Sequence, residues 1–382
     1  MATLLTCETV GPYAAALDLV SSAAAPVAVE IEGGNLNYAF RVTLSSTTSV
    51  FVKQAPGFIK CLGPEYTLAS ARIAVEVDAL RCFATYAGAE FVPAVLHFDE
   101  DRAVAVLEDL RDRVLLSEAL AESTAAVAEA HGAALGVFAA RLHEKSAAGL
   151  DELKERFANE EMVGITRAYV LTKPLDASDD TNRHSSALQE RVVALRADAA
   201  IAAAFERARA LFDGKPEALL HGDLHAGSVM VRRDGAGGVK AIDAEFAFVG
   251  PRGVDVGMAL AGYCFAWAAA LATDRAELAQ RLVAALAALW TAYATEGAGA
   301  PASVWADSTA FAGCELIRRL IGAAHSPAID AIADEATRGR AELLALDLGE
   351  ALLRGDIADL AAMRTSMEAA AGACTQERGD LG

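Results

Sequence analysis

The sequence is poor in cysteine and has fewer basic than acidic residues. Its six cysteines among 382 residues include no C-x-x-C pair, so we expect neither a disulfide scaffold nor a cysteine zinc site. The 33 Lys and Arg residues are outnumbered by 52 Asp and Glu residues, which gives a net charge of −19. Because nucleic acids and anionic lipids bind basic surfaces, we expect neither as a partner.

Basic residues are also missing from the start of the chain, where the first Lys or Arg is Arg41. Secretory signals and transit peptides need basic residues, so we expect neither, and we expect a cytoplasmic location. One apolar stretch, Val256 to Thr273, has no charged residue but is rich in Ala and Gly. It predicts a buried core helix rather than a membrane span.

Three common catalytic motifs are absent. The sequence has no G-x-x-x-x-G-K-[ST] loop, no G-x-S-x-G elbow and no H-E-x-x-H pair, which excludes the enzyme classes built on them. A composition of 54% hydrophobic and 22% charged residues is typical of a folded globular chain. We therefore expect an enzyme that acts on a small molecule.

The hydrophobic pattern divides the chain into two parts. Strands are expected at 27–31, 38–44, 49–54, 92–98 and 103–107, with a helix at 68–87, after an Ala-rich helical start that ends near Pro26. Helices are then expected at about 115–145, 184–211, 257–273, 276–296, 306–324 and 334–354, interrupted by a hairpin over 228–243. The pattern predicts an α+β, bilobal chain with a small β-rich N-lobe (1–109) and a larger helical C-lobe (110–382).

The segment richest in chemistry is His221–Ser228, which places Asp223 on a tight loop after an apolar run. Asp243 and Glu245 follow the second strand of the hairpin, and strand periodicity predicts both carboxylates on one face. If the hairpin folds back, Asp223 joins them. Three converging carboxylates repel one another unless a cation is present, so we predict an Mg²⁺ site.

The N-lobe offers groups for the phosphates of a nucleotide. Gly33 and Gly34 lie between two strands, where the lack of a Cβ lets backbone N–H groups approach phosphate oxygens. Lys53 is the only charge in the apolar strand Val50–Lys53, so its ammonium group needs an anionic partner. Glu76 on the following helix can supply one carboxylate, and a nucleotide phosphate the other.

These motifs, taken together, resemble those of the protein-kinase-like small-molecule kinases, the superfamily of aminoglycoside phosphotransferases and choline kinases. The resemblance is carried in order by Gly33–Phe40, Val52–Ala55, Leu107–Leu110, His221–Ser228, Ile242–Phe248, Gly250–Gly257 and Phe311–Arg319. Within the superfamily, the Asp-x-Glu pair and the Arg-Arg pair are similar to those of the 5-methylthioribose kinase family. The blocks span most of the chain.

The resemblance implies a bilobal kinase fold, ATP and Mg²⁺ as cofactors, and a role for each matching residue. Asp223 would orient the 1-hydroxyl of the sugar, or orient and deprotonate it, while Asp243 and Glu245 would bind Mg²⁺. Lys53 would hold the α- and β-phosphates, with Glu76 positioning it. The remaining assignments are Gly33, Gly34, Asn35 and Asn37 to the nucleotide, the backbone of Glu108 and Leu110 to adenine, and Arg318 and Arg319 to the transferred phosphoryl group.

The chain departs from the family pattern in three places. The segment Gly63–Leu68 lacks the family's Trp and Pro, Ala244 replaces a Pro between the metal ligands, and Ser228 stands where most of the superfamily has a metal-binding Asn. The acceptor is therefore open: a kinase of the same superfamily acting on another sugar, an amino alcohol or an aminoglycoside is the alternative, and a non-enzymatic binding module a weaker one. The resemblance also suggests a homodimer.

Overall fold

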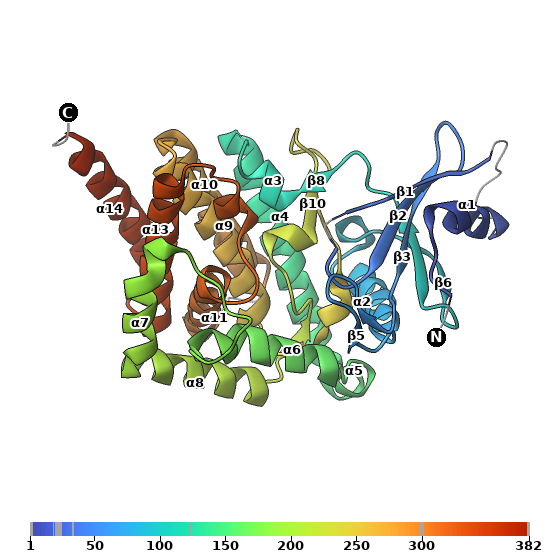
Figure 1. Cartoon of the computed structure of the whole chain (residues 1–382), viewed down its shortest axis with the longest axis horizontal. Helices are drawn as coiled ribbons and strands as arrows, with labels where there is room; N and C mark the ends of the chain where they lie inside the picture. Colours follow the sequence, from blue (N-terminus) through green and yellow to red (C-terminus); the bar gives the residue numbers. More distant parts are fainter. Residues whose placement is uncertain are drawn as a thin grey trace.

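The structure is a computed structural model that describes residues 3–17, 19, 25–32, 34–122, 124–297 and 302–379. The chain forms two parts, a β-rich N-lobe and a larger helical C-lobe, as expected (Figure 1). In the N-lobe a five-stranded antiparallel sheet has the order β1-β2-β3-β7-β6. Its strands are β1 (Val27–Glu30), β2 (Tyr38–Thr43), β3 (Ser49–Gln54), β7 (Val104–Glu108) and β6 (Val95–Asp99).

The two faces of this sheet are buried by different helices. Alternate residues of the central strands, such as Val50, Val52 and Val106, form a small apolar cluster with α1 (Cys7–Ala16). The opposite residues, including Leu107, join α2 (Arg72–Tyr86) in the main core. Lys53 lies on the α2 face between Ala39 and Ala105 of the neighbouring strands. Strand alternation therefore turns its ammonium group toward α2.

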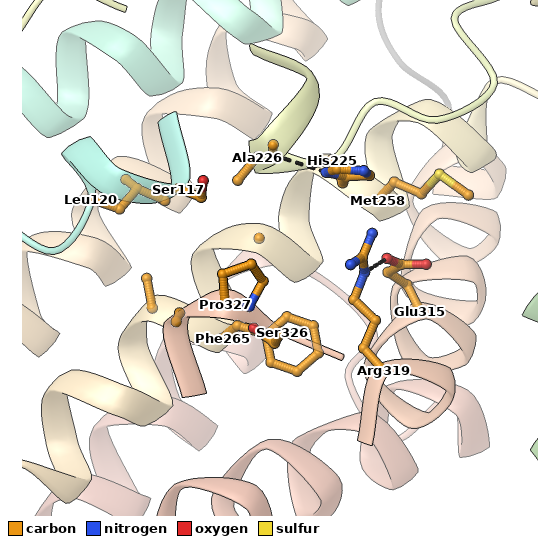
Figure 2. A pocket seen from close by; sticks show the side chains of 14 residues that line it. Ser117, Leu120, His225, Ala226, Met258, Phe265, Glu315, Arg319, Ser326 and Pro327 are labelled. Atoms are coloured by element: carbon orange, nitrogen blue, oxygen red, sulfur yellow. Dashed lines mark hydrogen bonds and ion pairs between the residues drawn. The ribbon is translucent and has the colours of Figure 1, made fainter. Parts of the chain in front are cut away.

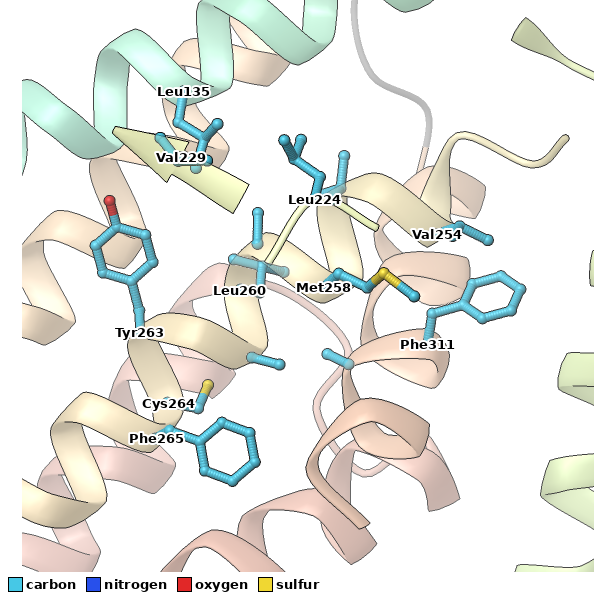
Figure 3. Packing of buried hydrophobic residues seen from close by; sticks show 14 of the residues in the cluster. Leu135, Leu224, Val229, Val254, Met258, Leu260, Tyr263, Cys264, Phe265 and Phe311 are labelled. Atoms are coloured by element: carbon cyan, nitrogen blue, oxygen red, sulfur yellow. The ribbon is translucent and has the colours of Figure 1, made fainter. Parts of the chain in front are cut away.

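The C-lobe is a set of helices around one buried helix. Its helices are α3 (Leu116–Ala119), α4 (Ala125–Ser146), α5 (Leu150–Arg156), α6 (Glu160–Leu171), α7 (Gln189–Ala197), α8 (Ala199–Gly214), α9 (Gly253–Ala272), α10 (Ala276–Glu296), α11 (Ala302–Ile321), α12 (Pro327–Asp330), α13 (Glu335–Arg354) and α14 (Leu360–Gly379). Helix α9 packs against α10, α11 and α13. Figure 3 shows its Met258, Leu260 and Tyr263 within this packing.

Helix α9 is also long and apolar enough to cross a membrane, the one such helix in the described part of the chain. However, 94% of its most apolar stretch is buried inside the protein. This burial confirms the expected core helix over 257–273, which begins four residues earlier than the sequence predicts, at Gly253.

Short strands place the loops of the C-lobe next to the N-lobe. A three-stranded sheet has the order β11-β10-β8, and β12 pairs with β9. Their bounds are β8 (Val114–Leu115), β9 (Ala218–Leu220), β10 (Val229–Val231), β11 (Val239–Ala241) and β12 (Phe248–Gly250). The expected hairpin over 228–243 is present as β10 and β11. A further hairpin in the N-lobe, β4 (Phe58–Ile59) with β5 (Gly63–Thr67), was not expected.

Several expected helices are wrong in extent. Within its described residues the Ala-rich start has one helix, α1, and the range 115–145 is divided into β8, α3 and α4. The range 184–211 is interrupted at Asp198, whose side chain accepts hydrogen bonds from the backbone N–H groups of Ala200 and Ile201. An Asp side chain used in this way begins a new helix, so one expected helix becomes two, α7 and α8.

Helices α5, α6 and α14 were not expected at all. Each buries only a narrow stripe, such as Met162, Thr166 and Val170 on α6, or Met363 and Met367 on α14. A stripe of one residue per turn gives a weak periodic signal.

Candidate active site

The segment His221–Ser228 is the loop between β9 and β10, and a buried carboxylate holds its backbone. Asp255, in the first turn of α9, accepts hydrogen bonds from the N–H groups of His221 (2.7 Å) and Gly222 (2.9 Å). Gly222 has a φ of +83°, and a Cβ there would lie 2.1 Å from the carbonyl oxygen of Phe246. The loop therefore packs directly against the segment that carries Glu245.

Asp223 lies on this loop beside three cationic or ionisable side chains. Its Oδ2 is 3.4 Å from Nε2 of His225, and its Oδ1 is 3.9 Å from Nη2 of Arg318. Burial alone raises the pKa of Asp223, but His225, Arg318 and Arg319 outweigh it and hold the pKa well below its usual value. Asp223 is therefore a carboxylate at neutral pH, and a weak base.

Arg318 and Arg319 lie in the last turn of α11 and share one partner. Glu315 is buried and accepts a hydrogen bond from Nε of Arg318 at 2.5 Å and another from Nε of Arg319. Adjacent helical residues point about 100° apart, but positions i+3 and i+4 both face position i, so both guanidinium groups meet at Glu315. Burial raises the pKa of Glu315, but the two arginines lower it by more, so the pKa lies below its usual value.

The placement of Asp243 and Glu245 corrects the sequence argument. Strand β11 ends at Ala241, Asp243 has a left-handed backbone (φ 59°, ψ 44°), and Glu245 lies in the short 3₁₀ helix η6 (Ala244–Phe246). The two residues are therefore not alternate positions of a strand. Both carboxylates nevertheless reach Lys53, with Oδ1 of Asp243 at 2.7 Å and Oε1 of Glu245 at 4.0 Å from its Nζ.

Lys53 and Glu76 form the expected pair. The Nζ of Lys53 is 2.8 Å from Oε2 of Glu76, and the side chains are only 6% and 1% exposed. Burial opposes the charge on Lys53, but the carboxylates of Asp243, Glu76 and Glu245 raise its pKa well above the ordinary value. For Glu76 burial dominates: despite the opposing effect of Lys53, its pKa is raised to about 7.

The expected convergence of three carboxylates is wrong. Among the residues that the structure describes, no group of three or more His, Cys, Asp or Glu side chains is arranged to hold a metal ion. The reason is that the carboxylates turn to different cations: Asp223 turns to His225 and Arg318, whereas Asp243 and Glu245 turn to Lys53.

Asp243 and Glu245 still fit Mg²⁺ as a pair of ligands. Their oxygens are the hard donors that this ion prefers. The Asp243 side chain is 47% exposed and therefore accessible to an ion that arrives with a nucleotide. Glu245 directs Oε2 to the amide of Asn37 at 2.7 Å and Oε1 toward Lys53. Ser228 is buried, with its hydroxyl 3.5 Å from Nε2 of His225.

The other expected nucleotide residues lie along the edge of the N-lobe. Gly33 lies outside the described residues, while Gly34 and Asn35 are exposed in the turn before β2. Asn37 is buried and bonded to Glu245. Glu108 ends β7, and its carboxylate accepts a hydrogen bond from Lys240 at 3.0 Å. Leu110 follows, buried, where the chain enters the C-lobe.

A small pocket of about 70 Å³ lies beside Asp223. Its polar walls include His225, Arg319 and Glu315, all connected to Asp223 or to its partner Arg318. Figure 2 shows Arg319 extending toward His225. The remaining wall is mainly apolar, with two serines and two glycines, and consists of Ser117, Leu120, Ala226, Gly227, Met258, Gly262, Phe265, Ala266, Ser326, Pro327 and Ala328. The pocket is too small for a whole sugar but has room for a small apolar group attached to one.

Comparisons with known proteins identify the family. Residues 27–294 match the phosphotransferase enzyme family. A methylthioribose kinase from Yersinia enterocolitica is 34% identical over 352 residues, covering 85% of this chain and 87% of its own length. A methylthioribose kinase from Bacillus cereus is 33% identical over 347 residues, covering 85% and 86%. The chain belongs to the methylthioribose kinase family.

Among solved structures, a glucosamine kinase in complex with glucosamine, ADP and inorganic phosphate is similar to this chain. The two chains have a TM-score of 0.49 and 18% sequence identity, with coverage of 91% of this chain and 84% of that one.

This member of the methylthioribose kinase family uses several side chains that the sequence did not single out. Asn159, before α6, donates to the carbonyl oxygens of Glu245 (2.8 Å) and Ala247 (3.1 Å). Arg72 lies 3.5 Å from Glu245, and Glu315 joins the arginine pair. A signal existed for Glu315, since an acidic residue three and four positions before two arginines faces both. For Asn159 and Arg72 the sequence has no comparable signal.

Proposed function

We propose that this chain transfers the γ-phosphoryl group of ATP to the 1-hydroxyl of 5-methylthioribose and so forms 5-methylthioribose 1-phosphate, a step of methionine salvage. The family assignment supports the reaction class. The observation that carries the choice of acceptor is the small apolar pocket beside Asp223, because a thiomethyl group is apolar and small.

The nucleotide would lie at the edge of the N-lobe. We assign its phosphates to Lys53 and to the turn that contains Gly33, Gly34, Asn35 and Asn37, and its adenine to the backbone of Glu108 and Leu110. Glu76 would hold Lys53 in place. Asp243 and Glu245 would bind Mg²⁺, which supplies charge neutralisation at the phosphates when it is bound.

Asp223 would orient the acceptor hydroxyl rather than act mainly as a base. The cations around it lower its pKa, and a carboxylate of such low basicity takes a proton poorly but still accepts a hydrogen bond from a hydroxyl group. Arg318 and Arg319 would offset the charge of the phosphoryl group in transfer. Glu315 already pairs with both, so they are held in place before any substrate arrives.

The acceptor would be oriented by its two ends. With its 1-hydroxyl at Asp223, its thiomethyl group would enter the pocket between Met258, Phe265 and Pro327. Ribose would bring a hydroxyl group, in place of the thiomethyl group, against these three apolar side chains. A group of this size is worth about 1–3 kcal/mol, or roughly 10–200-fold in specificity.

The test is a coupled assay of ADP release with MgATP and a panel of acceptors: 5-methylthioribose, ribose, choline, ethanolamine and an aminoglycoside. We expect 5-methylthioribose to have the highest kcat/KM, with ³¹P NMR identifying an anomeric phosphate. Turnover of another alcohol, with no ADP release above background from 5-methylthioribose, would refute the acceptor and retain only the reaction class.

Two broader properties belong to the same proposal, a cytoplasmic location and a homodimer. Light scattering coupled to size-exclusion chromatography tests the second, with a mass of twice the chain as the expected result.

A further inference from the structure

Arg72 is a buried arginine at the start of α2 that belongs to none of the roles above. Its side chain is 1% exposed. Its guanidinium group donates to the carbonyl oxygens of Leu36, Pro56, Phe58, Leu68 and Ala69 and, through Nε at 3.0 Å, to Oδ1 of Asn37. One side chain thus connects the turn before β2, the segment after β3 and the segment before α2.

The same side chain reaches the C-lobe. Its Nε lies 3.5 Å from Oε2 of Glu245, and Asn37 donates from Nδ2 to that oxygen at 2.7 Å. Arg72 fixes the amide of Asn37 by bonding to its oxygen, so the amide presents its NH₂ group to Glu245. Oε2 is thereby occupied by protein groups, and Oε1, 4.0 Å from Lys53, faces the cation site.

Helix α2 is therefore connected in two ways to the Mg²⁺ segment, which comprises residues 243–245. Glu76, one turn after Arg72, pairs with Lys53, and Lys53 pairs with Asp243. Arg72 makes the second connection, to Glu245, through Asn37. We propose that Arg72 is a positioning residue that assigns the two oxygens of Glu245, one to the protein and one to the metal ion. This inference rests on the proposed Mg²⁺-nucleotide site.

The charge of Arg72 and its geometry must be separated in the test. A lysine keeps the positive charge but lacks the planar fork that bonds Asn37 and the carbonyl groups together. We would therefore measure Mn²⁺ binding to the protein–ADP complex for Arg72→Lys, following the loss of the EPR signal of free Mn²⁺. The partners of metal-binding side chains are typically worth about 10–100-fold in metal affinity, so we expect a loss of about 10-fold or more.

A double-mutant cycle with Glu245→Gln distinguishes positioning from general damage. If Arg72 acts through Glu245, then Arg72→Lys in the Glu245→Gln background should change Mn²⁺ affinity by less than about twofold. Equal losses in both backgrounds, or no loss in the wild-type background, would overturn the proposal. Arg113→Lys is the matched control, because Arg113 also donates to two carbonyl oxygens, of Gly237 and Gly238, and has no bond to the Mg²⁺ segment.

Asn37→Ala covers the case in which Arg72→Lys does not fold. It keeps the five carbonyl contacts of Arg72 and removes the bridge to Glu245, so it should also lose about 10-fold or more in Mn²⁺ affinity. ADP affinity measured without metal reports separately on the role of Asn37 at the phosphates. An unchanged Mn²⁺ affinity would overturn the proposal. If the wild-type protein–ADP complex binds no Mn²⁺, the proposed metal–nucleotide site is refuted. If the wild-type complex binds Mn²⁺ but no more tightly than the variants do, only the role of Arg72 is refuted.

Discussion

Asp223 is surrounded by more positive than negative charge, and this environment determines what its carboxylate can do. With a pKa held below its usual value, it is ionised throughout the neutral range. Asp223→Asn keeps the shape and one hydrogen-bond acceptor but loses the charge that aligns a hydroxyl donor. We expect kcat to fall by about 10²–10⁴-fold, with ADP affinity within about twofold of wild type. Steady-state kinetics and calorimetry measure both, and a kcat within about tenfold of wild type would contradict the role.

Glu76 presents the opposite case, because burial raises its pKa to about 7. Its folded-state pKa thus exceeds the ordinary value of 4.5, so between these values the folded protein binds the proton more strongly than the unfolded chain. The free energy of unfolding should therefore fall as pH rises through this window, by roughly 2–3 kcal/mol from this group.

Urea denaturation at about pH 5 and pH 8, without nucleotide or Mg²⁺, measures this effect. Glu76→Gln cannot titrate, so its free energy of unfolding should lack this fall. Equal pH dependence in the two proteins would show that Glu76 stays ionised across the window.

Glu315 holds two arginines with one carboxylate. Glu315→Gln retains a hydrogen-bond acceptor but leaves both guanidinium groups without their buried counter-charge. We expect kcat to fall by about 10-fold or more and the free energy of unfolding by about 2–4 kcal/mol, since breaking a buried ion pair is costly. Glu342→Gln is the control, because Glu342 is also buried but bonds Ser185, outside the site. Comparable loss of kcat in both variants would argue against a specific role.

At the scale of elements, the C-lobe depends on the close approach of α4 and α10. Gly132 and Gly136 lie one turn apart on α4, and a Cβ on them would lie 2.3 Å from the carbonyl oxygen of Ala285 and 2.2 Å from that of Leu289. Gly132→Ala must push the two helices apart, so we expect a loss of about 1–3 kcal/mol or more. Gly164, inside α6, has open space instead. Gly164→Ala should stabilise the protein by about 0.5–1 kcal/mol, and thermal denaturation separates the two results.

The elements also show what the sequence can and cannot predict. Strands β2 and β3 and helix α10 were predicted within a residue or two, because long apolar periodicity decides them locally. Lys53 was singled out because a charge within an apolar strand is visible in the sequence, and Asp223 because a polar loop follows an apolar run. The expected pairing of Lys53 with Glu76 on the next helix is present. The 3₁₀ turn at Asp243 was not, since its left-handed backbone depends on contacts with Lys53 and with the loop of Gly222.

Contacts across long sequence separations escaped prediction for the same reason. Arg72 is separated from Glu245 by nearly half of the chain, and most of its hydrogen bonds go to carbonyl groups, which no side-chain pattern reveals. The side chain of Asn159 donates to two backbone oxygens, within the C-lobe. Residues of this kind become apparent only when segments far apart in the sequence are placed together.

At the scale of the whole molecule, the chain has a net charge of −19, and four cations lie at the proposed site. Lys53 and Arg72 lie on the N-lobe side, and Arg318 and Arg319 on the C-lobe side. All four have carboxylate partners there, so a bound polyanion would need a metal ion to offset the charge of Asp243 and Glu245. The acidic remainder of the surface disfavours non-specific binding of other polyanions.

Helix α2 and the inner face of the N-lobe sheet share one apolar core with the C-lobe, and beside that core the ion pairs Lys53–Asp243 and Arg72–Glu245 join the lobes. The small apolar cluster around α1 and the outer face of the N-lobe sheet is separate from the main core. MgADP bound between the lobes should therefore stabilise the whole chain. At an ADP concentration of about 100 times its Kd, binding adds about 2.7 kcal/mol to the free energy of unfolding.

Chelation of the metal by EDTA should remove most of that increment, because ADP without Mg²⁺ carries its full negative charge toward Asp243 and Glu245. Asp243→Ala should lose the Mg²⁺-dependent part of the increment even without EDTA. The ligand-free variant should itself be less stable by about 1–3 kcal/mol, because the buried Lys53 loses an ion-pair partner, so each increment is measured relative to the same protein without ligand. Urea denaturation of both proteins with ADP alone, with MgADP and with MgADP plus EDTA measures each part. Equal stabilisation by ADP with and without Mg²⁺ in the wild-type protein would mean that the ion does not bind between these carboxylates and the nucleotide.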